Sequence, residues 1–154
     1  MPQNPLADLT FRRATAQDAD AIKALVRSAR INPMDLDWRR FLLATSADGE
    51  LAACGQIKPH PDGTRELASI AVRPAWRGRG AARAIIERLL SDAPRPVHLT
   101  CRSGLEPFYQ KFGFHSLSSD ELTPYFRRIQ KLATAMMSVF RDGETLLVMR
   151  FDEP

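Results

Sequence analysis

The sequence has few cysteines and no long apolar run, and both absences narrow the kinds of protein that it can encode. Its 154 residues include two cysteines, Cys54 and Cys101. Two are too few for a disulfide framework and lack the spacing of metal ligands, so we expect free thiols and no metal. No stretch approaches the ~18 apolar residues that span a membrane, and residues 1–13 lack the apolar core of a signal peptide. We therefore expect a cytoplasmic protein without a membrane partner.

The chain carries a formal net charge of +4, which invites the hypothesis of a nucleic-acid partner. Its basic residues are spread along the chain, however, without zinc-finger spacing, an RNA-binding aromatic motif or a basic tail. The densest basic group is the set of arginines between residues 73 and 83. It surrounds a glycine turn, and a small anionic ligand bound at that turn would account for the positive charge. We therefore expect no nucleic-acid partner.

The stretch from Glu66 to Leu90, ELASIAVRPAWRGRGAARAIIERLL, organises the chain. It is typical of a short strand that ends before Pro74, followed by a glycine turn and an amphipathic helix from Ala81. Free backbone N–H groups at a helix N-terminus, together with the helix dipole, favour an anion, and glycine lets a phosphate approach the backbone. The arginines around this turn are Arg73, Arg77, Arg79 and Arg83.

A simpler interpretation of this turn remains open from the residues alone. Gly78 and Gly80 suit any tight turn, and arginines on a surface turn are usually solvated. The turn also lacks the GxxxxGK[ST] pattern of a P-loop and the third glycine of a dinucleotide-binding fingerprint. A phosphate-binding assignment therefore needs a more specific pattern.

Two motifs in the sequence provide this more specific pattern. The segment IAVRPAWRGRGAA resembles the acetyl-CoA-binding motif of the GNAT N-acetyltransferase superfamily, which runs Arg or Gln, two residues, Gly, one residue, then Gly or Ala. The matching positions are Arg77, Gly80 and Ala82. The stretch FYQKFGF, residues 108–114, is similar to a second family pattern, a Tyr followed by Gly-Phe, at a suitable separation from the first.

The resemblance implies the GNAT fold, an α/β (α+β) fold whose central mixed sheet is mostly antiparallel, contains a splayed parallel pair of strands and is flanked by helices. Local patterns predict compatible elements. The expected strands are residues 9–14, 41–45, 51–58, 66–72, 97–100, 114–117, 139–141 and 145–151. The expected helices are residues 15–30, 36–39, 81–91, 105–112 and 122–133. Residues 31–41, 55–58 and 66–70 are also similar to a branch of uncharacterised GNAT-like proteins from bacteria and plastids.

The length is that of one ordinary domain, which we expect to span residues 1–154. Residues 1–8, with two prolines, form a loose leader. Residues 121–134 form a helix inserted before the last hairpin, where family members usually have a simple loop. This helix is either a substrate-selecting lid or an added packing element.

The resemblance also implies the cofactor-binding residues. The backbone of the central strand would contact the pantetheine arm and acetyl carbonyl, the glycine turn would hold the pyrophosphate, and the first turn of the helix would add phosphate contacts. These residues are Ile70, Ala71, Val72, Arg77, Gly78, Arg79, Gly80, Ala81, Ala82 and Arg83.

Two catalytic residues follow from the same resemblance. Glu66 lies six residues before Val72, where several family members carry a Glu or His that deprotonates the amine, often through water. Tyr109 would protonate the departing thiolate. The alternatives are a strand-edge carboxylate that pairs with Arg65 or another neighbour, and a Tyr that packs in the core.

Other residues depart from the pattern or carry no expected role. Many relatives have an Asn at the position of Arg102 that helps to hold the pantetheine chain, and an Arg cannot accept a hydrogen bond. We expect Cys101 to be a buried, inert thiol. His60, His98 and His115 share no spacing that indicates a metal site or a catalytic triad.

The expected activity is acetyl transfer from acetyl-CoA to a primary amine of a small molecule or peptide by direct attack, in a monomer or homodimer. The alternative is a module that binds acyl-CoA without turnover and has a regulatory role. The acceptor amine is not identified by the sequence, although the absence of a dense acidic cluster argues against polycationic acceptors.

Overall fold

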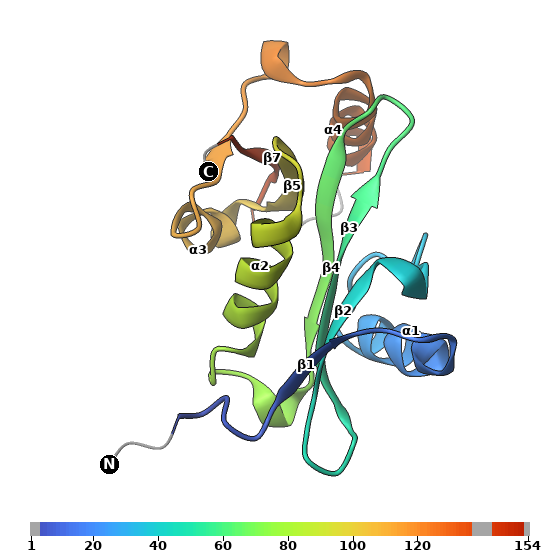
Figure 1. The fold of residues 1–154 in the computed structure, drawn as a ribbon. Coiled ribbons are helices and arrows are strands. Elements are labelled where there is room, and N and C mark those ends of the chain that lie inside the picture. The colour runs from blue at the N-terminus through green and yellow to red at the C-terminus, as the bar shows by residue number, and fades with distance from the viewer. Residues whose placement is uncertain (1–3, 137–142, 153–154) are drawn as a thin grey trace. The chain divides into compact units, whose positions relative to one another are not determined.

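The computed structural model describes residues 4–136 and 143–152 (Figure 1). Part of the predicted leader, residues 1–3, and the strand predicted at residues 139–141 lie outside the described residues. The chain forms two compact units, Met1–Ile57 with Leu67–Asp92, and Lys58–Glu66 with Ala93–Pro154. In the described ranges, no helix is long and apolar enough to cross a membrane.

The first unit contains the N-terminal strands and two helices. Its strands are β1 (Thr10–Arg13), β2 (Phe41–Thr45), most of β3 (Leu51–Pro59) and most of β4 (Arg65–Val72). Its helices are α1 (Ala19–Ser28) and α2 (Ala81–Asp92). β1 pairs antiparallel with β2, and β2 pairs antiparallel with β3, which is hydrogen-bonded on its other side to β4.

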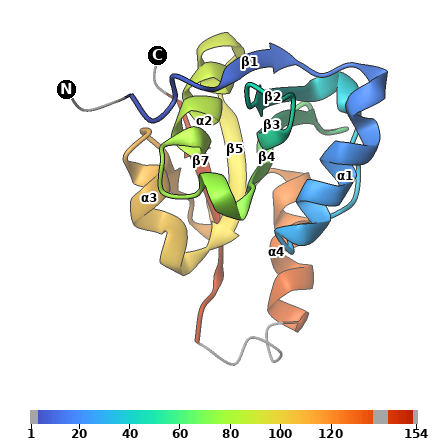
Figure 2. The same cartoon turned by 90° about the horizontal axis from the view of Figure 1, so that it is seen from below.

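α1 and α2 cover opposite faces of these strands (Figures 1 and 2). Ile22, Leu25 and Val26 of α1 recur at helical spacing and pack in one buried cluster with Cys54 of β3. The next residue of β3, Gly55, faces α2. Successive strand residues point to opposite faces, so β2 and β3 are buried almost throughout because both faces are covered.

The second unit contains the C-terminal strands. They are β5 (Val97–Arg102), β6 (His115–Ser116) and β7 (Leu146–Phe151). The helices of this unit are α3 (Glu106–Gln110) and α4 (Pro124–Met136). β7 pairs antiparallel with both β5 and β6. Phe126 of α4 lies in a buried cluster with Leu117, Leu122 and Val148.

The only parallel pairing recorded between described strands joins Glu66 of β4 to His98 of β5, and both residues belong to the second unit. The hydrogen-bonded strand order is β1-β2-β3-β4-β5-β7-β6. The predicted fold class is therefore confirmed: an α/β chain with a mixed, mostly antiparallel sheet, one parallel pair and flanking helices.

Several predicted helices differ from the structure at their ends. The helix predicted at residues 36–39 is a single 3-10 turn, Trp38–Arg40. The helix predicted at residues 105–112 is the short α3, which a 3-10 turn precedes and which ends before Gly113 at a φ of +104°. α4 begins at Pro124 rather than residue 122, because proline is tolerated in the first helical turn but not further in.

Gly55 provides a test of the packing between β3 and α2. A Cβ at this position would lie 2.5 Å from Cδ1 of Ile70 and 2.8 Å from Cγ2 of Ile85, well inside van der Waals contact. We expect Gly55→Ala to lower the free energy of unfolding by about 1–3 kcal/mol, the usual cost of overpacking. Urea denaturation monitored by circular dichroism would measure this change.

The double variant Gly55→Ala/Ile70→Val removes the nearest clashing methyl group and should recover part of the loss, with Ile70→Val alone as its reference. A single Gly55→Ala variant as stable as the wild type would contradict the close packing of β3 on α2.

Candidate active site

β4 bends immediately before the residues predicted to contact the acetyl group, Ile70–Val72. Ser69 has a φ of +60°, in the left-handed region that non-glycine residues rarely adopt. Its hydroxyl accepts a hydrogen bond of 2.8 Å from Nε2 of Gln56, and this nitrogen also lies 3.3 Å from the carbonyl oxygen of Asp35. A left-handed residue is typical of a β-bulge, where a strand bends, and the hydrogen bond from Gln56 contacts β4 at this point.

The turn between β4 and α2 has the geometry of an anion site. Gly78 and Gly80 have φ values of +75° and +86°, and no other part of the described chain would contact a Cβ at either position. The first hydrogen bond of α2 runs from the Ala84 N–H to the Gly80 carbonyl, at 3.0 Å. The N–H groups of residues 81–83 therefore lack intrahelical acceptors and can bind an anion.

Two of the four arginines near this turn form ion pairs. Arg73 donates from Nε to the Leu51 carbonyl at 2.8 Å and lies 3.2 Å from Glu50, so it links the ends of β3 and β4. Arg83 pairs with Glu87 at 2.9 Å one helical turn away. The side chains of this second pair are 72% and 54% exposed, and such surface pairs contribute little.

The other two arginines lie against the turn itself. Arg77 Nε is 3.3 Å from the carbonyl oxygen of Val72, and the guanidinium of Arg79 lies over the ring of Trp76 at 5.0 Å. Both cations are therefore held by neighbouring residues of the turn that leads into α2.

Glu66 lies in a separate, largely buried group in the second unit. Its Oε1 is 2.8 Å from Nε2 of His60, and the two side chains are only 12% and 6% exposed. The sequence offered Arg65 or another neighbour as the partner of this carboxylate, and the structure provides a histidine instead. The residues Pro61-Asp62-Gly63 are a turn signal that could have indicated that His60 lies near Glu66, although a turn signal alone does not say which side chains meet.

α4 holds this carboxylate–histidine pair in place. The ring of Tyr125 stacks on that of His60, with centroids 3.6 Å apart and planes at 15°. Asp62 accepts a hydrogen bond of 3.0 Å from the Tyr125 N–H at the start of the helix. Burial raises the pKa of Asp62, but hydrogen bonds from Thr64, Tyr125 and Thr123 outweigh it and lower the pKa overall. The charged carboxylate therefore ties α4 to the turn that carries His60.

His98 is the strand neighbour of Glu66, is 2% exposed and stacks on Phe126, with ring centroids 4.8 Å apart. Neither ring nitrogen has a hydrogen-bond partner among the described protein atoms. Burial lowers the pKa of His98, and the positive charge of Arg150 lowers it further. Its imidazole is therefore neutral in the folded protein at pH 7.

Tyr109 lies on α3 in an aromatic group, with Phe108 at 5.0 Å and Phe114 at 6.1 Å between ring centroids. Burial, with a smaller contribution from Cys101, raises the pKa of Tyr109 to about 12. The phenol therefore keeps its proton at neutral pH, as a proton donor must.

Cys54 and Cys101 are both free thiols, as predicted, and both are buried, which was predicted only for Cys101. Burial raises the pKa of Cys101 to about 11 and that of Cys54 to about 12, so neither forms the reactive thiolate at neutral pH. Sγ of Cys101 lies 3.8 Å from Sδ of Met149. Arg102 lies 3.5 Å from Glu144, in a contact that does not require it to accept a hydrogen bond.

The predicted site residues are thus divided by unit. The cofactor-binding set from Ile70 to Arg83 lies in the first unit, whereas Glu66 and Tyr109 lie in the second. The sequence missed Ser69 and Gln56 beside the first set, and His60 and His98 beside Glu66. Among the described residues, no group of three or more His, Cys, Asp or Glu side chains could hold a metal ion.

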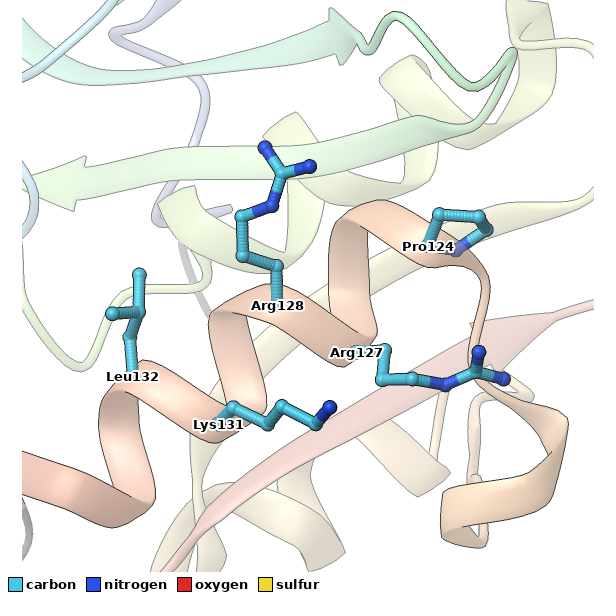
Figure 3. Close-up of a pocket in the computed structure, with 5 residues that line it drawn as sticks. All are labelled: Pro124, Arg127, Arg128, Lys131 and Leu132. Atoms are coloured by element: carbon cyan, nitrogen blue, oxygen red, sulfur yellow. The ribbon is translucent and has the colours of Figure 1, made fainter.

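α4 also borders a pocket of about 420 Å³ (Figure 3). The residues that line it are Pro124, Arg127, Arg128, Lys131 and Leu132. The helix sequence PYFRRIQKLATAM contains no acidic residue, so the pocket is lined by charge of one sign.

The burial of His98 predicts an acid-sensitive fold. Above pH 6.5, the ordinary pKa of histidine, the ring is neutral in both the folded and unfolded states and contributes no pH dependence. Below pH 6.5, His98 becomes protonated in the unfolded chain but stays neutral in the folded protein. The free energy of unfolding therefore decreases as the pH is lowered. We expect His98→Phe, which keeps a ring against Phe126, to reduce the fall in Tm between pH 7 and pH 5. Equal pH slopes for the two proteins would contradict the neutral, buried state of His98.

Known proteins are similar to this chain in fold, and a family model matches its sequence. Among solved structures, Rv2747 from Mycobacterium tuberculosis in complex with CoA is 22% identical, with a TM-score of 0.70, over 94% of this chain and 99% of that one. N-acetylglutamate synthase from Neisseria gonorrhoeae, complexed with CoA and N-acetyl-glutamate, is 19% identical with a TM-score of 0.69. That match covers 96% of this chain but only 36% of the Neisseria protein.

The ribosomal-protein-S18-alanine N-acetyltransferase from Escherichia coli is 19% identical, with a TM-score of 0.66, over 94% of this chain and 93% of that one. At these identities the likeness establishes the fold. No curated protein sequence matches the chain significantly. The model of the acetyltransferase (GNAT) family matches residues 9–114, which include both the β4–turn–α2 segment and Tyr109. The chain therefore belongs to the GNAT acetyltransferase family.

Proposed function

We propose that the protein transfers the acetyl group of acetyl-CoA to a primary amine by direct attack. The β4–turn–α2 geometry carries this proposal, since two positive-φ glycines expose free amides at the start of a helix beside two held arginines. Such a site suits a pyrophosphate. The family match and the CoA complexes of the structural neighbours support the same ligand.

In this proposal the first unit binds the cofactor. The amides of residues 78–82 and the side chains of Arg77, Arg79 and Arg83 contact the phosphates. The weak surface pair of Arg83 with Glu87 can open to allow this contact. The backbone of Ile70–Val72, whose direction is set by the bend at Ser69, contacts the pantetheine arm and acetyl carbonyl.

Glu66 removes the proton that the amine must lose. The amine nitrogen bonds to the thioester carbon, the C–S bond breaks, and the amine proton passes to Glu66 directly or through water. His60 positions the carboxylate, because its ring nitrogen lies 2.8 Å from Oε1 and is itself fixed by stacking on Tyr125. Much of the acceleration in such a reaction comes from alignment of the two substrates.

Tyr109 supplies a proton to the thiolate that leaves. Its raised pKa of about 12 keeps the phenol protonated at neutral pH, so it can act as a donor there. The ring lies on the short α3 in contact with Phe108 and Phe114, and this packing helps to orient the phenol.

We also propose that both units form one catalytic domain in a cytoplasmic protein. The family match runs from residue 9 to residue 114 and so includes residues of both units. The acceptor is a small molecule or peptide rather than a nucleic acid, because the cations near the turn are accounted for by the cofactor.

The first test combines binding with turnover. We expect acetyl-CoA to raise Tm of the purified protein, and we expect thiol release with at least one member of a panel of primary amines. Gly80→Val should abolish the rise in Tm because valine is strained at a φ of +86°, whereas Ala47→Val, in the exposed turn between β2 and β3, should preserve it. Binding without thiol release on any amine would identify a regulatory module instead, and the absence of binding would refute the proposal.

The roles of Glu66 and Tyr109 predict different pH profiles. An amine with a pKa near 10 is mostly protonated at neutral pH, so a base matters most at low pH and least as the amine deprotonates by itself. Glu66→Gln should therefore lower kcat more at pH 6.5 than at pH 9. Tyr109→Phe should lower kcat by about 100-fold throughout this range, because the phenol stays protonated. A constant ratio for Glu66→Gln would remove Glu66 from the proton transfer, and an unchanged kcat for Tyr109→Phe would assign Tyr109 to packing.

A further inference from the structure

Gln56 of β3 is fully buried, although its side chain is polar and the family motifs assign it no role. Its Nε2 donates to the Ser69 hydroxyl at 2.8 Å and to the Asp35 carbonyl at 3.3 Å. Its Oε1 has no hydrogen-bond partner among the described protein atoms. Because an unpartnered buried polar atom costs free energy, an apolar side chain would pack here at lower cost. What the amide contributes must therefore lie in its two contacts.

The first contact is to Ser69, the residue of β4 with a left-handed backbone. This conformation costs free energy for a residue with a Cβ, so it persists only where the surroundings hold it. Sγ of Cys54 donates to the Ser69 carbonyl at 3.5 Å, while Gln56 binds the hydroxyl. Cys54 and Gln56 are two residues apart on β3 and so point to the same face. Two side chains of one strand thus bind both polar groups of the strained residue.

The second contact fixes Gln56 itself. The Asp35 carbonyl that accepts from Gln56 also accepts from Nη2 of Arg40, at 3.2 Å. Arg40 is paired with the Asp35 carboxylate at 2.5 Å, and its side chain is only 19% exposed. Since a carbonyl oxygen is only an acceptor, the NH2 end of the Gln56 amide must face it. The donor that Gln56 presents to Ser69 is therefore held in one orientation.

The bend at Ser69 directly precedes Ile70–Val72, the backbone that we propose contacts the acetyl carbonyl. At a β-bulge the ladder is locally disrupted, so a backbone group is left without its strand partner. A free N–H of fixed direction can donate to a thioester carbonyl oxygen and stabilise the negative charge that develops there during attack. Such a donor is effective only if it is oriented before the reaction, which requires that the bend be held.

We propose that Gln56 is a positioning residue for acetyl transfer. Held by Asp35, it keeps Ser69 in the left-handed conformation, and the bend directs backbone N–H groups of Ile70–Val72 to the carbonyl oxygen of the thioester. Gln56 acts through Ser69 and touches neither substrate. This inference rests on the proposed acetyl transfer and names the residue that orients its hydrogen-bond donors.

The test compares two substitutions of Ser69 that both remove the hydroxyl. Glycine adopts a left-handed backbone without strain, whereas alanine does not. We expect Ser69→Gly to keep kcat within about threefold of the wild type, and Ser69→Ala and Gln56→Met each to lower it about tenfold. The double variant Gln56→Met/Ser69→Ala should be no slower than either single variant, because the two residues act as a unit. Kd for CoA should not change in any of them, since the phosphates bind at a different turn.

A matched control separates positioning from a general loss of stability. Thr45 of β2 is also buried, at 7% exposure, and its hydroxyl donates to the Thr10 carbonyl at 3.4 Å. Thr45→Val removes a buried hydrogen bond from the same unit, so it should lower Tm but leave kcat unchanged.

The infrared stretch of the bound thioester gives a measurement that does not require turnover. With an isotope label at the acetyl carbonyl, the C=O stretch of bound acetyl-CoA should lie at lower frequency in the wild type and Ser69→Gly than in Gln56→Met and Ser69→Ala. A hydrogen bond to the carbonyl oxygen weakens the C=O bond, so loss of the oriented donor raises the frequency.

Equal losses of kcat in Ser69→Gly and Ser69→Ala would overturn the inference, because the hydroxyl rather than the bend would then matter. An unchanged kcat in Gln56→Met, or the same C=O stretch in all four proteins, would also overturn it. If Gln56→Met does not fold, the two Ser69 variants decide. If acetyl-CoA binds but no amine is acetylated, the acetyl transfer is refuted, and the C=O stretch alone decides whether Gln56 orients the thioester. If acetyl-CoA does not bind, both proposals are refuted.

Discussion

The buried contact between Glu66 and His60 is the constraint on which the second unit depends. A carboxylate removed from water must find a hydrogen-bond donor, because an uncompensated buried charge is strongly destabilising. His60 fills that need only because the turn before Glu66 returns it to the carboxylate and α4 holds its ring. The hydrogen bond from the Tyr125 N–H to Asp62 then joins the helix to the same turn. The position of the proposed base is thus determined by packing as well as by its strand.

α4 consequently serves more than one purpose in the molecule. Its buried face contributes Phe126 to the core of the second unit and stacks that ring on His98. Its first turn positions His60 through Tyr125. Its exposed face carries only positive charge and borders a pocket. The two interpretations left open by the sequence, a packing element and a substrate-selecting element, are therefore compatible, since one helix has different faces.

Sequence reasoning was most successful where the determining interactions are local. The strand at residues 41–45, the turn glycines and the helix from Ala81 all follow from neighbouring residues, and the structure places them at those positions. Helix ends were less accurate, because termini depend on capping contacts such as the one between Asp37 and the Arg39 N–H. His60 was missed because Pro61-Asp62-Gly63 indicates a turn between it and Glu66 but does not determine the register, and so does not determine which side chains meet.

The sequence by itself determined the family and the fold class, since these rest on short-range patterns and a distinctive order of elements. Only the tertiary structure decided the environment of each reactive group. Burial among aromatic rings raises the pKa of Tyr109, burial also keeps Cys101 as a thiol, and Gln56 of β3 bonds the left-handed Ser69 of β4. These properties depend on desolvation and on contacts between residues distant in sequence, which a local pattern of residues does not encode.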